Sequence, residues 1–209
     1  PADARAAADA AHAQFADAKS EFVGILKLWQ AYREAHEEMT QSQLRKWADK
    51  QFLGFLRLRE WWELHRQLKL QCEELGWDAD ARPLPSAERR GGLGRGAVAS
   101  SQGTTATPSQ PPPASQGEET GGPPFAALHR ALIAGLPTTI GNRGSGTDRK
   151  AGGLYDGPRG RKFQLFPGSN LASKPPPWVL SATLLDTEKV WSLTNAAIEP
   201  DWVIAELPH

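Results

Sequence analysis

The feature that most constrains how this chain folds is the stretch at residues 81–124, which contains almost no large apolar side chain. Its residues are mostly Gly, Pro, Ser, Thr, Gln, Ala and Arg. Such a segment cannot bury enough apolar surface to offset the conformational entropy that is lost on folding. We therefore predict a disordered linker at residues 81–124, between one domain at residues 1–80 and a second domain at residues 125–209.

Residues 1–80 show the spacing of amphipathic helices. The first 18 residues are interpreted as a weak, Ala-rich helix. Ser20 is placed as the N-cap of a second helix that runs to about residue 38. The apolar residues of this helix recur at three- and four-residue steps, which predicts one buried face. They are Phe22, Ile25, Leu26 and Trp29.

Two further helices are predicted before the linker. Thr40 and Gln43 fit a capping box that opens a short helix. The next helix spans about residues 52–75 and ends where Gly76 can adopt the left-handed conformation of a C-cap. Its predicted buried stripe consists of Phe52, Phe55, Leu56, Trp61 or Trp62, Leu64, Leu68, Cys72 and Leu75. The short connections between these helices predict an antiparallel bundle.

The chain after the linker combines helices and short strands. Helical spacing resumes at residues 125–136 and ends at Pro137. Short segments rich in β-type residues and bounded by turn signals follow at residues 154–156, 161–166, 178–185 and 189–198. Pro200 suits the first turn of a short terminal helix. The expected fold class is therefore α+β, with an N-terminal helical bundle, a linker and a small β-barrel with flanking helices.

Charge is balanced overall but unevenly distributed. Lys+Arg and Asp+Glu both number 24, whereas between residues 143 and 174 there are seven basic residues and only two acidic ones. The basic residues are Arg143, Arg149, Lys150, Arg159, Arg161, Lys162 and Lys174. A local basic surface is what a nucleic-acid groove requires, because phosphate contacts supply most of the non-specific affinity. A solvated loop surface explains the same pattern equally well.

Several kinds of site are not indicated by the sequence. Cys72 is the only cysteine, which excludes an intrachain disulfide and a cysteine-rich zinc site. The five histidines lack metal-ligand spacing, and each is expected at the surface or at an edge. Residues 141–147 lack the Lys-Ser/Thr pair of a phosphate loop and are interpreted as a flexible hairpin loop. No stretch approaches the roughly 18 apolar residues of a membrane span. A chain that begins at Pro1 is expected to be a piece of a longer one.

Two groups of residues resemble a known family. The first group consists of Phe-Gln-Leu-Phe-Pro-Gly-Ser-Asn-Leu at residues 163–171, Lys-Pro-Pro-Pro-Trp-Val at residues 174–179 and Ile-Glu-Pro-Asp-Trp-Val at residues 198–203. These segments resemble the C-terminal OB-fold of DEAH-box helicases. The Phe-Pro-Gly-Ser turn at residues 166–169 resembles that of the bacterial HrpA-type RNA helicases in particular. The second group, within residues 20–29 and 52–68, resembles the helical ratchet region that precedes this OB-fold.

The resemblance implies an accessory region of an ATP-dependent RNA helicase, in which an OB-type barrel binds single-stranded RNA beside the motor domains. The sequence has no Walker-type phosphate loop and no Asp-Glu-Ala-His box, so no ATPase activity is expected of the chain alone. ATP and Mg²⁺ are implied only for the absent motor domains, and no cofactor is expected here. The expected partners are RNA and the motor domains, without a membrane, and the implied location is cytoplasmic. The alternative hypothesis is a protein-interaction platform that docks onto the helicase core or an activator and makes little RNA contact.

Six basic residues are candidate nucleic-acid ligands, and no catalytic or metal-binding residue is predicted. The candidates are Arg149, Lys150, Arg159, Arg161, Lys162 and Lys174. Adjacent residues of a strand point to opposite faces. If Phe163 and Leu165 fill the barrel, then Lys162 lies on the outer side and Arg161 shares the face of Phe163. Lys162 is therefore expected to contribute more to phosphate binding than Arg161.

Overall fold

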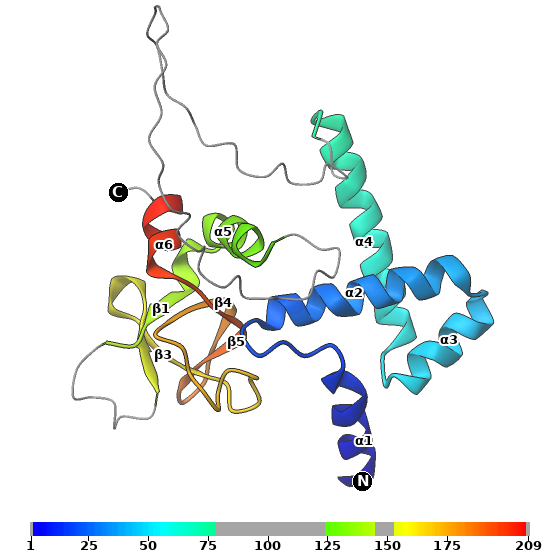
Figure 1. The fold of residues 1–209 in the computed structure, drawn as a ribbon, viewed down its shortest axis with the longest axis horizontal. Coiled ribbons are helices and arrows are strands. Elements are labelled where there is room, and N and C mark those ends of the chain that lie inside the picture. The colour runs from blue at the N-terminus through cyan, green and yellow to red at the C-terminus, as the bar shows by residue number, and fades with distance from the viewer. Residues whose placement is uncertain (1, 78–123, 145–152, 208–209) are drawn as a thin grey trace, which may run out of the picture. The chain divides into compact units, whose positions relative to one another are not determined.

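The structure is a computed structural model that describes residues 2–77, 124–144 and 153–207. The predicted linker at residues 81–124 lies outside the described residues, except for Pro124. Within the described ranges, the helices before residue 78 and the strands after residue 139 belong to one compact unit (Figure 1). None of the helices in these ranges is long and apolar enough to cross a membrane.

The first described range, residues 2–77, contains helices whose predicted caps are present. They are α1 (Ala2–Ala13), α2 (Glu21–Glu38), α3 (Gln41–Lys50) and α4 (Phe55–Glu74). The N-cap of α2 is confirmed, because the Ser20 hydroxyl oxygen accepts a hydrogen bond from the Val23 N–H at 3.2 Å. The capping box of α3 is confirmed as well. Thr40 Oγ1 accepts from the Gln43 N–H at 3.4 Å, and Gln43 Oε1 accepts from the Thr40 N–H at 2.9 Å.

Helix α4 ends at a left-handed glycine, as predicted. Gly76 has a φ of 73°, and the N–H groups of Gly76 and Trp77 donate to the carbonyls of Glu73 (3.0 Å) and Cys72 (2.8 Å). This pair of bonds is a Schellman motif, which requires the conformation that glycine adopts without strain. The helix begins later than predicted, because Phe52 has a positive φ of 56° and precedes the first helical turn.

A small aromatic core joins α2 to α4. Trp29, Tyr32 and Leu58 are buried. The Trp29 ring lies 4.8 Å from the ring of Trp61 and 5.6 Å from the ring of Trp62, measured between centroids. Both indoles at the start of α4 therefore pack on the same residue of α2.

Two of the predicted buried faces are wrong in part. Ile25 is 45% exposed, and the buried side of α2 runs instead through Trp29, Tyr32 and Ala35. Along α4 most of the predicted stripe is exposed, and the one buried residue of this helix is Leu58. The exposed members are Phe52, Leu56, Leu64, Leu68 and Leu75. Periodicity identifies the apolar side of a helix, but it does not reveal whether the chain supplies a partner for that side.

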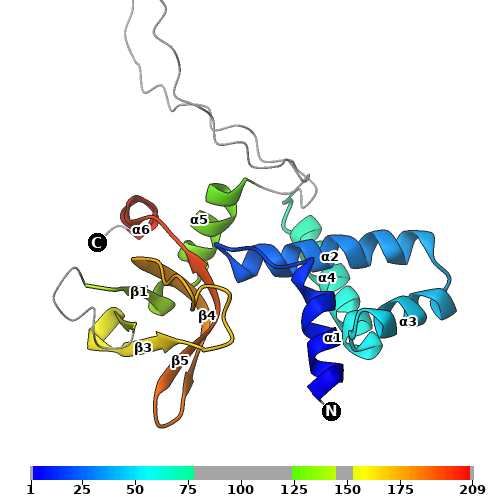
Figure 2. The ribbon, with the colours of Figure 1, turned by 60° about the horizontal axis from the view of Figure 1, so that its bottom comes forward.

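Residues 124–207 contain a closed barrel with the strand order β1-β2-β3-β5-β4 (Figure 2). Its elements are α5 (Phe125–Gly135), β1 (Ile140–Asn142), β2 (Leu154–Asp156), β3 (Lys162–Leu165), β4 (Trp178–Asp186), β5 (Val190–Ala197) and α6 (Pro200–Glu206). Strands β3 and β5 are parallel, and the other neighbouring strands are antiparallel. The α+β class with a small OB-type barrel is confirmed. The short strand β1 was missed, because it lies in a segment interpreted as a polar loop.

The barrel interior is closely packed. Tyr155, Phe163, Leu171 and Val179 are each at most 2% exposed. Gly141 of β1 lies against this core, since a Cβ atom built on it would stand 2.4 Å from Cζ of Phe163. Position 141 therefore requires glycine because a larger residue has no room beside Phe163. Its backbone does not have the positive φ that favours glycine elsewhere.

The start of α2 is attached to the barrel by hydrogen bonds. The Ala197 N–H donates to the Lys19 carbonyl at 2.7 Å. The Glu21 carboxylate accepts from the N–H of Asn195 at 2.6 Å through Oε2 and from the N–H of Asn170 at 3.0 Å through Oε1. One carboxylate thus binds β5 and the loop before β4. The predicted division into domains at residues 1–80 and 125–209 stays a prediction.

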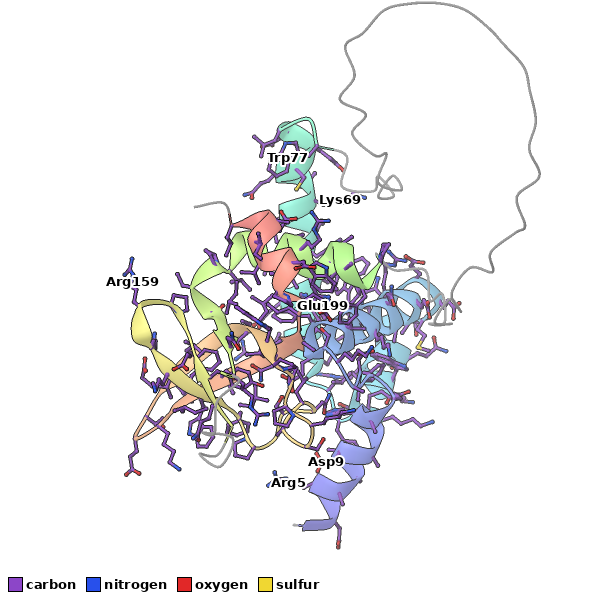
Figure 3. The ribbon with its side chains drawn as sticks, turned by 60° about the vertical axis from the view of Figure 1, so that its left-hand side comes forward. Arg5, Asp9, Lys69, Trp77, Arg159 and Glu199 are labelled. Atoms are coloured by element: carbon purple, nitrogen blue, oxygen red, sulfur yellow. The ribbon has the colours of Figure 1, made fainter. Side chains whose placement is uncertain are left out.

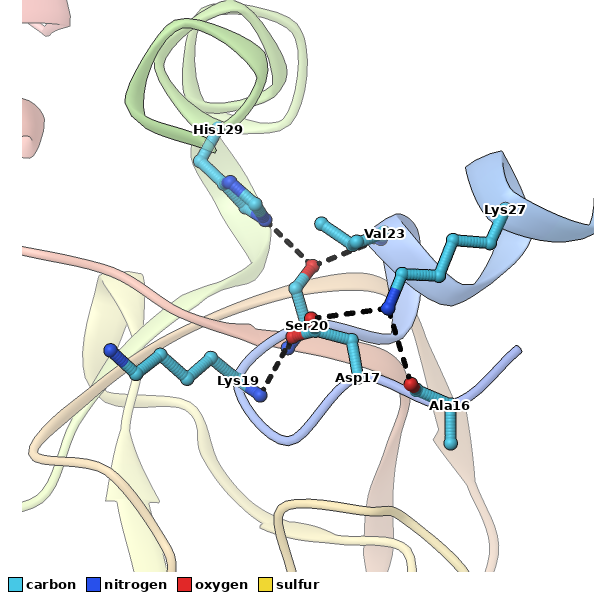
Figure 4. Close-up of polar contacts among 7 residues, drawn as sticks. All are labelled: Ala16, Asp17, Lys19, Ser20, Val23, Lys27 and His129. Carbon is cyan, nitrogen blue, oxygen red and sulfur yellow. Dashed lines mark hydrogen bonds and ion pairs between the residues drawn. The ribbon is translucent and has the colours of Figure 1, made fainter. Parts of the chain in front are cut away.

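His129 takes part in the same junction, and its expected position at the surface is wrong. The residue is fully buried, and its Nε2 lies 2.7 Å from the Ser20 hydroxyl oxygen (Figure 4). Its Nδ1 lies 2.6 Å from the carbonyl oxygen of Phe125. Burial lowers the pKa of His129, while the Phe125 carbonyl and Asp17 act in the opposite direction. A neutral ring that donates from Nδ1 and accepts at Nε2 satisfies both contacts.

Candidate nucleic-acid interface

The outer side of β3 presents Lys162 and Gln164, because the alternate residues fill the barrel. Phe163 and Leu165 are 1% and 8% exposed, whereas the Lys162 side chain is 62% exposed. Lys162 therefore lies on the outer side, as predicted. Phe166 follows the strand directly and is also exposed.

An aromatic and cationic cluster continues this surface onto β5. Gln164 is paired with Trp191 across the parallel strands β3 and β5. The rings of Trp191 and Phe166 meet edge to face, with centroids 6.2 Å apart and planes at 84°. Lys189 Nζ lies 5.9 Å from the centroid of Trp191, within the range of a cation–π interaction. Phe166 is exposed and Trp191 is half-buried. Accessible rings with nearby cations are the means by which proteins stack the bases of single-stranded nucleic acids.

We call this surface the outer face; it consists of Lys162, Gln164, Phe166, Lys189 and Trp191. Sequence reasoning did not single out the last three as site residues. A partial signal was present, since alternation along the predicted strand at residues 189–198 places Trp191 opposite the buried Ser192. That Trp191 meets Phe166 follows only from the pairing of β3 with β5.

Two of the candidate ligands already have acidic partners. Arg161 precedes β3 and donates through Nη2 to both carboxylate oxygens of Asp186, at 2.6 and 2.5 Å. The expectation that Arg161 shares the face of Phe163 stays a prediction. Lys162 Nζ lies 3.5 Å from Asp156 Oδ1, and both side chains are more than half exposed. An exposed ion pair such as Lys162–Asp156 contributes little free energy, so a phosphate can replace Asp156 as the partner of Lys162. Arg161 is less available, because its guanidinium donates to both carboxylate oxygens of Asp186.

Arg159 and Lys174 lie in connecting loops. Arg159 has a φ of 58° in the short turn Pro158–Gly160 between β2 and β3, and its side chain points away from the ribbon (Figure 3). Lys174 is exposed in the loop between β3 and β4. No contact among the described residues joins either side chain to the outer face. Arg149 and Lys150 lie outside the described residues.

The loop that carries Lys174 is held by its three consecutive prolines. The carbonyl of Pro175 accepts from Arg143 Nη1 at 3.2 Å, and that of Pro177 accepts from the Arg143 N–H at 2.8 Å. The Tyr155 hydroxyl donates to the Pro176 carbonyl at 2.7 Å. Burial raises the pKa of Tyr155 to about 12, so the hydroxyl stays protonated and donates near neutral pH. Arg143 thus fixes the loop, although its charge also contributes to the basic segment.

The described residues do not gather a ligand set for a metal. Across residues 2–77, 124–144 and 153–207, no group of three or more His, Cys, Asp or Glu side chains is placed to hold an ion. The outer face offers the ammonium groups of Lys162 and Lys189, the amide of Gln164 and the two rings of Phe166 and Trp191.

Comparisons with known proteins agree with this geometry. Residues 128–209 match the family model of the oligonucleotide/oligosaccharide-binding (OB)-fold. The chain is 30% identical to an ATP-dependent RNA helicase HrpA homolog of Haemophilus influenzae over 203 residues. This matched region is 97% of this chain and 12% of that protein. It is 28% identical to the ATP-dependent RNA helicase HrpA of Escherichia coli over 209 residues. This matched region is 100% of this chain and 13% of that protein, so the chain spans only a small part of the relatives that it matches.

Proposed function

We propose that this chain, whose resemblance to the HrpA-type RNA helicases extends over its whole length, is an accessory region of such a helicase. In this proposal the chain binds single-stranded RNA on the outer face of its barrel and supports the motor domains during unwinding. The observation that carries it is the Phe166–Trp191 pair, which lies beside Lys162 and Lys189 on a closed OB-type barrel. Barrels of this kind hold single strands through a basic track and sequence-tolerant contacts to bases.

In this proposal, some members of the outer face contact the bases of the RNA and others contact its phosphates. Trp191 and Phe166 stack against bases, because every base has a π-face that an indole or phenyl ring can meet. Lys162 and Lys189 neutralise phosphates, and Gln164, the strand partner of Trp191, donates to or accepts from a base edge. Arg159 and Lys174 extend the positive charge along the two loops that flank the face. Arg161 contributes less, because Asp186 already occupies its guanidinium.

The remaining partners belong to the same proposal. Motor domains of a longer helicase supply ATP hydrolysis with Mg²⁺, while this chain binds neither. A cytoplasmic location is supported by the single cysteine, which suits a reducing compartment. It is also consistent with relatives that are described as RNA helicases.

The test is the salt dependence of binding to a fluorescently labelled, single-stranded RNA oligonucleotide, measured by anisotropy. Lys162→Ala is expected to lower the slope of log K against log salt by about 0.7, the value for one phosphate contact on a single strand. Trp191→Ala is expected to weaken binding by 1–3 kcal/mol, which is roughly 5- to 150-fold. Arg161→Ala is expected to change both quantities less than Lys162→Ala.

Lys46→Ala is the matched control, because Lys46 is an exposed lysine of α3 outside the barrel. Its slope is expected to equal that of the unaltered chain. If Lys162→Ala and Trp191→Ala bind as the unaltered chain does, while circular dichroism shows them folded, the outer face is not the RNA site. Absence of any salt-dependent binding by the unaltered chain favours the alternative of a protein-interaction platform.

A further inference from the structure

The turn that follows β3 carries Phe166, one of the two rings of the outer face. The backbone of Phe166 is bonded on both sides: its N–H donates to the Ser192 carbonyl at 3.1 Å, and its carbonyl accepts from the Ser169 N–H at 2.9 Å. The ring lies against the turn, since a Cβ atom built on Gly168 would stand 3.1 Å from Cε1 of Phe166. The position of the ring therefore depends on how residues 166–170, which we call the β3 turn, are held.

Asn195 of β5 holds both backbone partners of Phe166. Its Nδ2 donates to the Ser192 carbonyl at 3.2 Å and to the Ser169 hydroxyl oxygen at 3.3 Å. Its Oδ1 accepts from the Ser181 hydroxyl at 2.8 Å. Because a carbonyl can only accept, the contact with Ser192 fixes which end of the amide faces the β3 turn. Asn195, Ser181 and Ser192 are fully buried, so a donor or acceptor left without a partner here costs free energy.

Glu21, the first residue of α2, holds Asn195 in turn. Besides accepting from the N–H groups of Asn195 and Asn170, its carboxylate lies 3.4 Å from Asn195 Nδ2. Thr194, the residue before Asn195, has a φ of 55°, which is unusual for a β-branched residue. Such a backbone conformation persists only where the surrounding contacts hold it, and the next N–H along the chain is the one that Glu21 accepts. One carboxylate thus holds β5 and the far end of the β3 turn together.

From this geometry we infer that Glu21 is a positioning residue for RNA binding, which acts on the ring of Phe166 through Asn195 and the β3 turn. The inference rests on the proposed function of the outer face. Glu21 itself does not contact RNA. Its carboxylate keeps the turn in place, and the turn keeps the Phe166 ring edge to face with Trp191, where a base can stack. The helical region, which supplies Glu21, thereby contributes to the RNA affinity of the barrel.

Charge and positioning predict opposite effects for the loss of this carboxylate. Removing a negative charge near a site for a polyanion strengthens binding, because like charges repel. Releasing the β3 turn weakens binding, because a base stacks well only on a ring that is held in place. A loss of folding free energy alone does not alter the affinity of the molecules that stay folded. The direction in which the RNA affinity of Glu21→Ala changes therefore identifies the role of Glu21.

The test is a double-mutant cycle with Glu21→Ala and Phe166→Ala in the whole chain, measured by anisotropy of the labelled single-stranded RNA. Phe166→Ala is expected to weaken binding roughly 5- to 150-fold through the loss of one stacked base. Glu21→Ala is expected to weaken it by at least about 3-fold. Its salt slope should stay unchanged, because no phosphate contact is lost. In the Phe166→Ala background, Glu21→Ala is expected to change the affinity by less than about 2-fold, since the ring that it positions is gone.

Glu37→Ala is the matched control, because it removes an exposed carboxylate from the same helix and should not weaken binding. Ser169→Ala is the second variant. It removes a half-buried acceptor of Asn195, should weaken binding in the same direction, and replaces Glu21→Ala in the cycle if circular dichroism shows that variant unfolded.

The inference is overturned if Glu21→Ala binds RNA as tightly as the unaltered chain or more tightly, while Phe166→Ala binds more weakly. Equal weakening by Glu21→Ala with and without Phe166 also overturns it, because Glu21 would then act independently of the ring. Unchanged binding by Phe166→Ala overturns the proposed function of the outer face, and the inference with it. The affinity of Phe166→Ala thus distinguishes the two failures.

Discussion

The barrel and the helical region differ in how completely they bury their own apolar side chains. In the barrel, Tyr155, Phe163 and Val179 are buried from all sides by a closed sheet. In the helical region, the core around Trp29 and Tyr32 is buried, but α4 continues beyond it with its leucines in water. A closed sheet supplies its own neighbours for every strand, whereas a helix buries its second side only against another element. The closed sheet thus buries the apolar core of the barrel, whereas the second half of α4 has no such cover among the described residues.

The largest effect is expected from truncating a buried ring of the barrel. Phe163→Ala should lower the free energy of unfolding by about 3–5 kcal/mol, because it removes a large side chain and leaves a cavity. Leu68→Ala in α4 should change it by no more than about 0.5 kcal/mol, since Leu68 is 52% exposed. Urea unfolding followed by circular dichroism measures both. Similar losses for the two variants would show that Leu68 is covered within this chain.

A smaller effect is expected at the junction between the two regions. Glu21→Ala should cost about 1–3 kcal/mol of unfolding free energy, because it leaves the N–H groups of Asn195 and Asn170 without their acceptor. Glu37→Ala, at an exposed position of the same helix, is the control and should have little effect. Hydrogen exchange offers a local readout: the amides of Asn195 and Asn170 should exchange faster in Glu21→Ala. Unchanged exchange at both amides would contradict the assigned role of Glu21.

Substitution of a glycine should distinguish crowded from open backbone. Gly141→Ala should destabilise the chain by about 1–3 kcal/mol, because its Cβ would collide with the ring of Phe163. Gly135→Ala is the matched control, since a Cβ there meets nothing within 4 Å at the end of α5. That change should be neutral or slightly stabilising. Thermal unfolding of the two variants measures the difference, and equal melting temperatures would refute the close packing around β1.

The smallest effect is expected from the titration of His129. Its pKa is lowered in the folded state from the ordinary value of 6.5, so the unfolded chain binds the proton more tightly. The resulting stability is fully present above pH 6.5 and is lost as the pH falls below that value. In His129→Gln this contribution is absent, so the variant should lose less unfolding free energy than the unaltered chain between pH 7.5 and 5.5. Parallel pH profiles for the two proteins would contradict a buried neutral His129.

Local sequence signals predicted the elements of this fold well. The Ser20 cap, the Thr40–Gln43 capping box and the Gly76 C-cap depend on residues within one or two helical turns, and all three are confirmed. Strands β2 to β5 were also found, since they combine β-type residues with turn signals at both ends. Strand β1 was missed because Ile140–Asn142 is short and includes Gly141, a residue type that is uncommon in strands. Glycine is needed at this position because the ring of Phe163 leaves no room for a side chain, which the sequence does not reveal.

The candidate site was predicted only in part. Alternation along β3 correctly placed Lys162 outward, because a strand repeats every two residues whatever surrounds it. The rule could not reveal that Arg161, which precedes the strand, pairs with Asp186 of β4, because that contact joins residues 25 positions apart in the chain. The Phe166–Trp191 pair escaped prediction, since it depends on which strands are neighbours.

The sequence by itself determined the helices, most of the strands, their caps, the alternation of β3 and the resemblance to HrpA-type helicases. The helices, strands and caps depend on residues that are close together in the chain. The resemblance depends on short motifs that occur in the same order as in the helicases. The tertiary structure alone decided that His129 is buried against Ser20, that Glu21 binds β5 and that Leu64 and Leu68 of α4 face water. The physical reason is that burial depends on what packs against a residue, and that partner is set by contacts between segments far apart in the sequence.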